Sequence, residues 1–303
     1  MNDYALVRTS TERGPRAGLV VADSIYDVAD GTGRSEWTSI KLILASGAES
    51  DAALRRLASK PGTTSVALAT TSLLPPVDEP SAIFCIGANY RDHAISMAKV
   101  HGTPLEPDAR QLGLSPWFFI KTAHALVAPN AAVSLRSERL DWEAELAVVI
   151  GRPARDVSVD QALQYVGAYT IGNDLSARDR AVRSKIRETS PFRFDWVAHK
   201  NFEGGCALGP ALIPAAQVGD PQSLQIKLWV NDEIKQDSST AQMIFSVAEQ
   251  VAFLSTLVTL RPGDVILTGT PAGTGAEQKV FLKHGDRIRI EIEKLGQLVT
   301  SIC

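Results

Sequence analysis

The stretch Asp141-Trp-Glu-Ala-Glu-Leu-Ala-Val-Val-Ile150 places acidic residues directly before an apolar run. Side chains of a strand alternate between its faces, so Asp141, Glu143 and Glu145 share one face. That face continues into apolar positions 147 and 149, which belong in a core. Unpaired carboxylates entering a core are costly, because each one disfavours ionisation of its neighbours. A hard divalent cation bound by two or three of them offsets this cost, whereas an edge strand with a wet acidic face is the simpler alternative.

A second acidic position follows another apolar stretch, Tyr169-Thr-Ile-Gly-Asn-Asp174. If this stretch is a strand, the carboxylate of Asp174 at its end completes a three-oxygen site with Glu143 and Glu145. The alternative is that Asn173 and Asp174 only open a turn. Oxygen-only ligation favours Mg²⁺ or Mn²⁺ over zinc.

Three further features are compatible with catalysis. His93 follows the apolar strand expected at 82–86 and precedes an irregular loop at 98–116, a position typical of a catalytic base, although a surface or capping histidine is the simpler interpretation. The glycine-rich turn at 268–275 has backbone amides suited to a carboxylate, but such turns often have no other role. The arginine-rich stretch at 178–193 indicates either a solvated face or a guide for an anionic substrate.

The composition limits the class of protein. The 303 residues carry a net charge of −3, which disfavours nucleic acid as a partner, and no run of 18 apolar residues predicts a membrane span. Three scattered cysteines and an N-terminus without a signal-peptide pattern predict a cytoplasmic protein with reduced thiols. The absence of CxxC and HExxH patterns argues against a zinc enzyme.

Expected strands outnumber expected helices and do not alternate with them, which predicts an α+β protein that is mostly antiparallel β. Capping-box patterns predict helices beginning after Ser158, with an end near Gly167, and after Ser246. The prolines of the stretch 73–77 predict a stiff linker. We therefore expect a small N-terminal domain at 1–75 and a catalytic domain at 76–303.

These segments, in this order, resemble the fumarylacetoacetate hydrolase superfamily from about residue 83 to the C-terminus. The resembling segments are Cys85-Ile-Gly-Ala-Asn-Tyr-Arg-Asp-His93, Asp141-Trp-Glu-Ala-Glu-Leu146, Gly172-Asn-Asp-Leu-Ser-Ala-Arg-Asp179, Pro262-Gly-Asp-Val-Ile266 and Thr268-Gly-Thr-Pro-Ala-Gly273. The resemblance implies a mixed β-sandwich roll with a small N-terminal domain, commonly a homodimer. It also implies a metal-dependent enzyme that acts on a small-molecule 2-oxo acid.

The resemblance also implies roles for individual residues. Glu143, Glu145 and Asp174 match the metal ligands, with Mg²⁺ or Mn²⁺ as the cofactor, and His93 matches the general base. Lys200 matches a lysine that contacts the substrate. Substrate-contacting positions in the matching motifs are Thr270, Gly269, Tyr90 and Arg91.

Two departures from the family pattern bear on the reaction. Many members have a glutamate three residues after the histidine, where this chain has Ser96, and a glutamine where it has Ala181. Glu106 and Asp108 of the irregular loop are the acids expected to orient His93 instead. The implied activity is hydrolysis of an acylpyruvate, such as fumarylpyruvate or maleylpyruvate, to pyruvate and a carboxylic acid. The alternatives are a 2-oxo dicarboxylate decarboxylase or isomerase, which needs no activated water, and a catalytically idle binding module.

Overall fold

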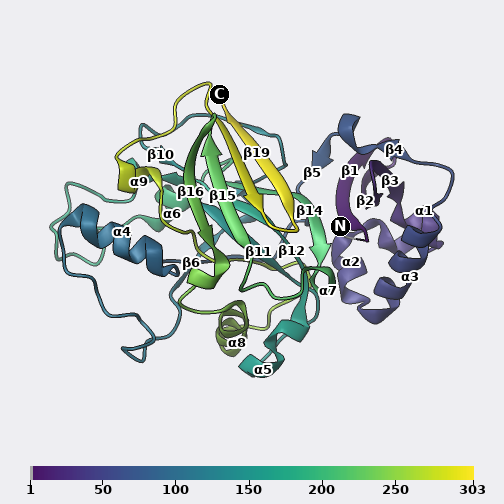
Figure 1. Ribbon diagram of the computed structural model, residues 1–303, viewed down its shortest axis with the longest axis horizontal. Helices are drawn as coiled ribbons and strands as arrows, with labels where there is room; N and C mark the ends of the chain where they lie inside the picture. Colours follow the sequence, from purple (N-terminus) through teal and green to yellow (C-terminus); the bar gives the residue numbers. More distant parts are fainter. Residues whose placement is uncertain (1–2) are drawn as a thin grey trace.

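The computed structural model describes residues 3–303, and the first two residues of the expected N-terminal domain lie outside the described residues. Its largest sheet has twelve strands and runs from the N-terminal elements through the middle of the molecule (Figure 1). The main path of this sheet is β4 (Val66–Ala67), β3 (Ser24–Asp27), β2 (Gly14–Val21), β1 (Ala5–Thr11), β14 (Cys206–Pro214), β12 (Val166–Asp174), β11 (Ala144–Ile150), β17 (Val265–Leu267), β6 (Ile83–Ile86) and β7 (Phe118–Lys121). The short strands β5 (Leu73–Leu74) and β8 (Leu126–Val127) pair with β1 and β14.

A second sheet packs against the first. It contains β16 (Glu233–Ser239), β15 (Gln225–Val230), β18 (Arg287–Ile292), β19 (Gly296–Ile302) and β9 (Ala132–Val133). A two-stranded ladder joins β10 (Leu140–Asp141) and β13 (Ser176–Ala177). The described strand pairs are antiparallel except β6 with β17, β8 with β14 and β9 with β19, so the prediction of a mostly antiparallel α+β fold is confirmed.

The helices are short and lie around the sheets (Figure 1). The α-helices are α1 (Val28–Thr32), α2 (Ile40–Ala45), α3 (Ala48–Ser59), α4 (Arg91–His101), α5 (Val159–Ala162), α6 (Trp196–Lys200), α7 (Ala215–Val218), α8 (Val247–Leu257) and α9 (Gly275–Gln278). Helix α8 begins with the predicted capping box, because Ser246 and Glu249 each accept from the other's backbone N–H.

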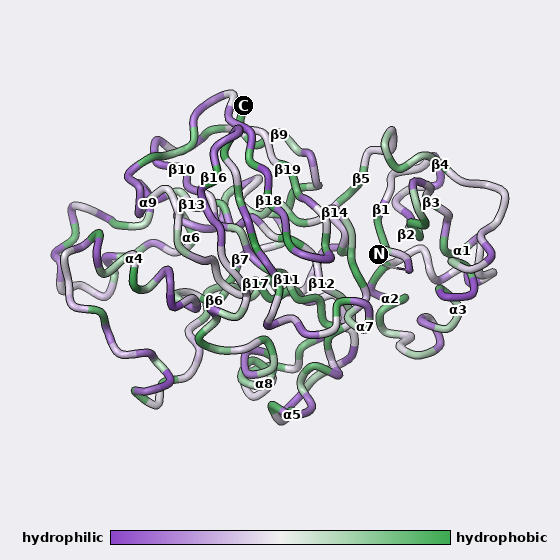
Figure 2. Tube along the Cα trace, viewed as in Figure 1, coloured by the Kyte–Doolittle hydropathy of each residue, from purple (hydrophilic) through white to green (hydrophobic). Residues whose placement is uncertain are grey.

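Strand β11 is buried on both faces, which explains its continuous apolar run. Leu146 and Val148 pack in the core between the two sheets, with residues such as Ile226. Ala147 and Val149 pack in a second core that includes Trp37 of the N-terminal region. Hydrophobic residues run through these central strands, and hydrophilic ones are concentrated in the outer loops (Figure 2). The face that carries Glu145 therefore enters a core, as predicted.

The expectations for the region 158–167 are met in part. A helix begins after Ser158 and continues through the 3₁₀ turn Leu163–Tyr165, so it ends near Gly167 as expected. The capping box does not form, because the Ser158 side chain makes no capping hydrogen bond. From Val166 onward, β12 pairs with both β11 and β14. Residues 73 and 74 of the expected linker form β5 against β1. The domain division at residue 75 stays a prediction.

Candidate active site

Strand pairing brings three carboxylates together. In the antiparallel register of β11 and β12, Glu145 lies opposite Gly172, and the N–H of Asp174 donates to the Glu143 carbonyl at 3.0 Å. All three acidic side chains are buried, and ligand atoms of Glu143, Glu145 and Asp174 lie within 4.8 Å of one another. In the described residues 3–303 this is the one cluster of its kind.

Asp141 is not part of this cluster, although it shares the alternating pattern. Strand β10 ends at Asp141 and β11 begins at Ala144, so the alternation is interrupted between them. The buried Asp141 carboxylate instead accepts from the N–H groups of Gly275 and Ala276, at 2.6 and 3.0 Å. It also accepts from Arg178 Nε at 2.8 Å. Asp141 therefore links Arg178 to the start of α9.

Three cations compensate much of the negative charge. Lys200 Nζ lies 2.7 Å from Glu143 and 2.6 Å from Asp174, and Lys121 Nζ lies 2.7 Å from the other Asp174 oxygen. Arg178 contacts Glu143 at 2.5 Å. Burial pushes the pKa of Glu143 up, but the charges of Lys200 and Arg178 outweigh it and hold that pKa far below its ordinary range.

Glu145 is in a different situation. Its carboxylate accepts the Gly269 N–H at 2.7 Å, and no ion-pair partner is found for it among residues 3–303. Burial, together with the charges of Asp174 and Glu143, raises its pKa well above the ordinary value. Three cations thus face four carboxylates, once Asp141 is included. The residues present fit a divalent cation, because it neutralises the uncompensated charge with the oxygen ligands that Mg²⁺ and Mn²⁺ prefer.

His93 is held by an acid that the sequence analysis missed. The His93 Nδ1 forms a short hydrogen bond with Glu277 of α9, whose side chain is 4% exposed. The Ser96 hydroxyl donates to the other Glu277 oxygen at 2.5 Å. The expectation that Glu106 or Asp108 orients His93 is therefore wrong: Asp108 pairs with Arg91 at 3.6 Å. The sequence contained one signal for this role, because Glu277 is an acid two residues after the glycine-rich turn. It lies 184 residues from His93, so the sequence alone did not connect the two.

These groups surround a cavity of about 210 Å³, which we call the carboxylate cavity. It is lined by Ile86, Gly87, Ala88, His93, Trp117, Phe119, Glu143, Glu145, Arg178, Trp196, His199, Lys200 and Thr270. Four of the expected site residues do not line it: Tyr90, Arg91, Asp174 and Gly269. Tyr90 is fully buried, and Arg91 donates to the Met243 carbonyl at 2.8 Å. Gly269 contributes its N–H to Glu145.

Two more residues of this region were not anticipated. Lys121 is completely buried and donates to the carbonyls of Lys200 and Gly205, at 2.6 and 2.8 Å. A lysine directly after the apolar stretch 118–120 was the one sequence signal for it. His199 lines the cavity, and burial and the charges of Lys200 and Arg178 lower its pKa to about 3, which keeps it neutral.

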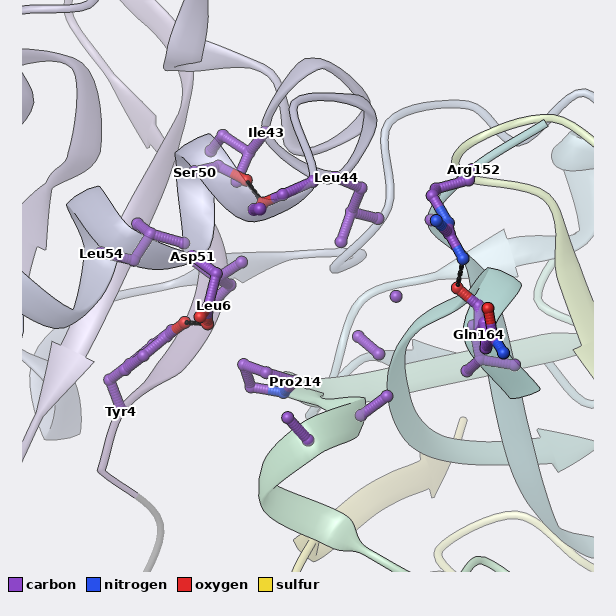
Figure 3. Close-up of a pocket in the computed structure, with 18 residues that line it drawn as sticks. Tyr4, Leu6, Ile43, Leu44, Ser50, Asp51, Leu54, Arg152, Gln164 and Pro214 are labelled. Atoms are coloured by element: carbon purple, nitrogen blue, oxygen red, sulfur yellow. Dashed lines mark hydrogen bonds between the residues drawn. The ribbon is translucent and has the colours of Figure 1, made fainter. Parts of the chain in front are cut away.

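A second cavity has about 450 Å³ and lies between the N-terminal elements and strands β12 and β14 (Figure 3). We call it the interface cavity. Apolar residues such as Leu44, Leu54 and Pro214 line much of it. Its polar groups are already paired: the Tyr4 hydroxyl donates to Asp51 at 3.2 Å, and Arg152 donates to the Gln164 carbonyl at 2.5 Å. It is the larger of the two cavities, but the acidic cluster is not in its lining.

A family model described as "Fumarylacetoacetate (FAA) hydrolase C-terminal" matches residues 82–303. The chain therefore belongs to the fumarylacetoacetate hydrolase superfamily, which confirms the resemblance. Human mitochondrial oxaloacetate tautomerase FAHD2B is 39% identical over 235 residues, which cover 76% of this chain and 69% of that protein. No helix within residues 3–303 is long and apolar enough to cross a membrane.

Solved structures of similar proteins cover nearly the whole chain. Maleylpyruvate hydrolase from Sphingobium sp. SYK-6, solved with manganese(II) and pyruvate, is 27% identical with a TM-score of 0.75, over 99% of this chain and 98% of that one. 2-Hydroxyhepta-2,4-diene-1,7-dioate isomerase from Mycobacterium marinum is 28% identical with a TM-score of 0.70, over the same shares. The chain is thus similar to a tautomerase, a hydrolase and an isomerase.

Proposed function

We propose that this protein is a metal-dependent tautomerase that interconverts the keto and enol forms of a small 2-oxo dicarboxylic acid such as oxaloacetate. The observation that carries this proposal is His93, which Glu277 holds at the wall of a cavity that Glu143 and Glu145 also line. Asp174 completes the carboxylate cluster with these two residues. A histidine held in this way is suited to moving a proton at the carbon next to a 2-oxo group. The 39% identity to an oxaloacetate tautomerase supports the same reaction.

Each residue at the site has a role in this proposal. Glu143, Glu145 and Asp174 hold Mg²⁺ or Mn²⁺, which when bound supplies Lewis-acid stabilisation of negative charge on the 2-oxo oxygen. His93 Nε2 takes the proton from the neighbouring carbon as a carbon–carbon double bond forms. The protonated His93 then gives a proton to the 2-oxo oxygen, which completes the enol and restores the base. Lys200 and Arg178 add positive charge beside the reacting oxygens.

Thr270 and the size of the cavity support a small substrate. Thr270 lines the cavity, and its hydroxyl is oriented by the amide of Gln236 at 2.9 Å, so it is placed to contact the substrate carboxylate. The carboxylate cavity, with about 210 Å³, is smaller than the roughly 300–1,000 Å³ typical of pockets for drug-sized ligands. A four-carbon diacid suits this volume better than a long acylpyruvate.

Hydrolysis of an acylpyruvate is the second candidate, and one observation favours it. Because Glu277 holds His93, activation of a water molecule does not require an acid at position 96. His93 would then deprotonate water for attack on the distal carbonyl, which releases pyruvate and a carboxylic acid. The maleylpyruvate hydrolase similarity supports this alternative.

One panel of assays separates the two candidates. The Mg²⁺- or Mn²⁺-loaded protein is given oxaloacetate, and the decay of enol absorbance is compared with that of the His93→Ala variant. The same preparations are given acetylpyruvate, maleylpyruvate and fumarylpyruvate, and pyruvate is quantified. Accelerated enol decay without pyruvate supports the tautomerase. Pyruvate with one equivalent of a second acid supports the hydrolase, and no turnover in either assay contradicts both.

A homodimer and a cytoplasmic location stay predictions. Several relatives, including the human protein above, have names that describe them as mitochondrial. Size-exclusion chromatography with light scattering tests the dimer, and tagged expression in the native cell tests the location.

A further inference from the structure

The helix that carries His93 is attached to the molecule by polar contacts. None of the 11 residues of α4 is buried. Near its start, the Ser238 hydroxyl donates to Asp92 at 2.5 Å, and Arg91 donates to the Met243 carbonyl at 2.8 Å. Helix α4 also contacts α9, and its apolar residues Ala94, Met97 and Ala98 are only half-buried. Because α4 has no fully buried apolar residue, hydrogen bonds contribute much to fixing the direction of the His93 imidazole.

Ser96 makes one of the two hydrogen bonds between α4 and Glu277. It lies three residues after His93, so both side chains project from the same face of the helix. The Ser96 hydroxyl donates to Glu277 Oε2 at 2.5 Å, while Glu277 Oε1 meets His93 Nδ1. One carboxylate therefore bridges the two residues. With Oε2 fixed by Ser96, rotation of the carboxylate away from the imidazole is opposed.

The glycine-rich turn fixes Glu277 from the other side. The Gly273 N–H donates to Glu277 Oε2 at 2.9 Å, and the Thr274 hydroxyl lies 3.3 Å from Oε1. Gly273 has a φ of 103°, and a Cβ there would lie 1.9 Å from the Lys235 carbonyl oxygen, so only glycine fits. The turn is thus packed against β16, and the carboxylate has a rigid support.

We propose that Ser96 is a positioning residue, whose hydroxyl fixes the Glu277 carboxylate so that this carboxylate holds the His93 imidazole toward the carboxylate cavity. The role of His93 as the base rests on the proposed function. A glutamate at position 96 would set two carboxylates against each other, and each would disfavour ionisation of the other. A serine hydroxyl at that position donates instead, so the acid supplied by α9 and the serine on α4 form a matched pair.

Three variants test this role through kinetics. Ser96→Ala removes the hydroxyl, Ser96→Thr retains it, and Lys99→Ala is a matched control at an exposed position of the same helix. We expect Ser96→Ala to lower kcat about tenfold with KM within about twofold, because a hydrogen bond to a charged group is lost while substrate contacts remain. The kcat and KM of Ser96→Thr and Lys99→Ala should stay close to those of the parent.

The decisive measurement does not require turnover. In ¹⁵N-histidine-labelled protein, the His93 Nδ1 signals are assigned among five histidines by their loss in His93→Gln. We expect a slowly exchanging Nδ1 proton in the parent, in Ser96→Thr and in Lys99→Ala, and its broadening or loss in Ser96→Ala. Parent-like His93 signals in Ser96→Ala would overturn the proposal. A parent that turns over no 2-oxo acid would overturn the proposed function instead, and the Nδ1 signals would still decide the role of Ser96.

Discussion

The two sides of the carboxylate cavity are built in different ways. Glu145 and Asp174 lie on β11 and β12, adjacent strands whose ladder is buried on both faces. His93 lies on α4, which has no buried residue and is held by hydrogen bonds at its surface. The backbone ladder fixes the first side, and side-chain contacts fix the second. Cation binding and proton transfer should therefore respond to different substitutions.

The largest effect is expected from His93→Ala. Removal of the base should lower kcat by about 10²–10⁴-fold, because general-base assistance typically contributes that much. The affinity for Mn²⁺, measured by calorimetry, should stay within about twofold, because His93 is not among the clustered carboxylates. A large loss of Mn²⁺ affinity in this variant would show that the two sides of the cavity are not separable.

Glu145→Gln should have the opposite effect to His93→Ala: it should weaken Mn²⁺ binding more than it lowers kcat at saturating Mn²⁺. We expect Mn²⁺ affinity to fall about 100-fold, since one of three charged oxygen ligands becomes a neutral amide. Calorimetry with the metal-free protein measures this loss. At saturating Mn²⁺, much of the activity should return if the His93 side is intact, whereas an unrecovered kcat would contradict the separation.

Glu277→Gln tests the support of the base. We expect kcat to fall about 10–100-fold while the Mn²⁺ affinity is unchanged. The reason is that a neutral amide at position 277 holds the His93 Nδ1–H less strongly than the charged carboxylate does. Glu106→Gln is the matched control, since Glu106 lies exposed in the loop after α4. Equal losses in the two variants would contradict the assignment of Glu277.

The stability of the metal-free protein should depend on pH through Glu145. Its pKa in the folded state is raised above the ordinary 4.5, so above that pH the unfolded chain releases a proton that the folded protein retains. The contribution of Glu145 to stability is therefore present below pH 4.5 and is lost as the pH rises toward the folded value. In urea unfolding, the free energy of unfolding of metal-free Glu145→Gln should fall less than that of the parent as the pH rises from 4.5 to 8, because the variant has no carboxyl to ionise at this position. A parallel pH dependence of the two proteins would contradict this.

The smallest effect is expected at the interface cavity. Leu44→Trp fills part of that space, which lacks the acidic cluster (Figure 3). Steady-state activity should stay within about twofold of the parent, although the free energy of unfolding changes. A loss of kcat comparable to that of Glu277→Gln would reveal a coupling between the two cavities.

Much of the ligand side was predictable because it depends on short-range rules. The face that Glu145 shares with positions 147 and 149 follows from the period of a strand, and burial of those two positions follows from their apolar character. The helix after Ser246 was predictable because its capping box is local. At Ser158 the same pattern gave the start of the helix, but the Ser158 side chain makes no capping hydrogen bond.

The base side was predictable only in part. The position of His93 after an apolar strand indicated a base, but the acid that holds it comes from α9, and no periodicity connects residues 184 positions apart. Lys121 was missed for a similar reason. A single lysine in a sequence is expected in solvent, and only the fold shows that Asp174 and two backbone carbonyls surround it.

By itself, the sequence determined the strand that carries Glu145, the mostly antiparallel β character and the family. These follow from the alternation of side chains along one strand, from composition and from the order of motifs. The tertiary structure decided that Glu277 supports His93, that Asp141 turns to Arg178 and α9, and that Lys121 is buried beside Asp174. The physical reason is that alternation is a property of the backbone within a few residues, whereas contacts between distant segments exist only once sheets and turns have packed.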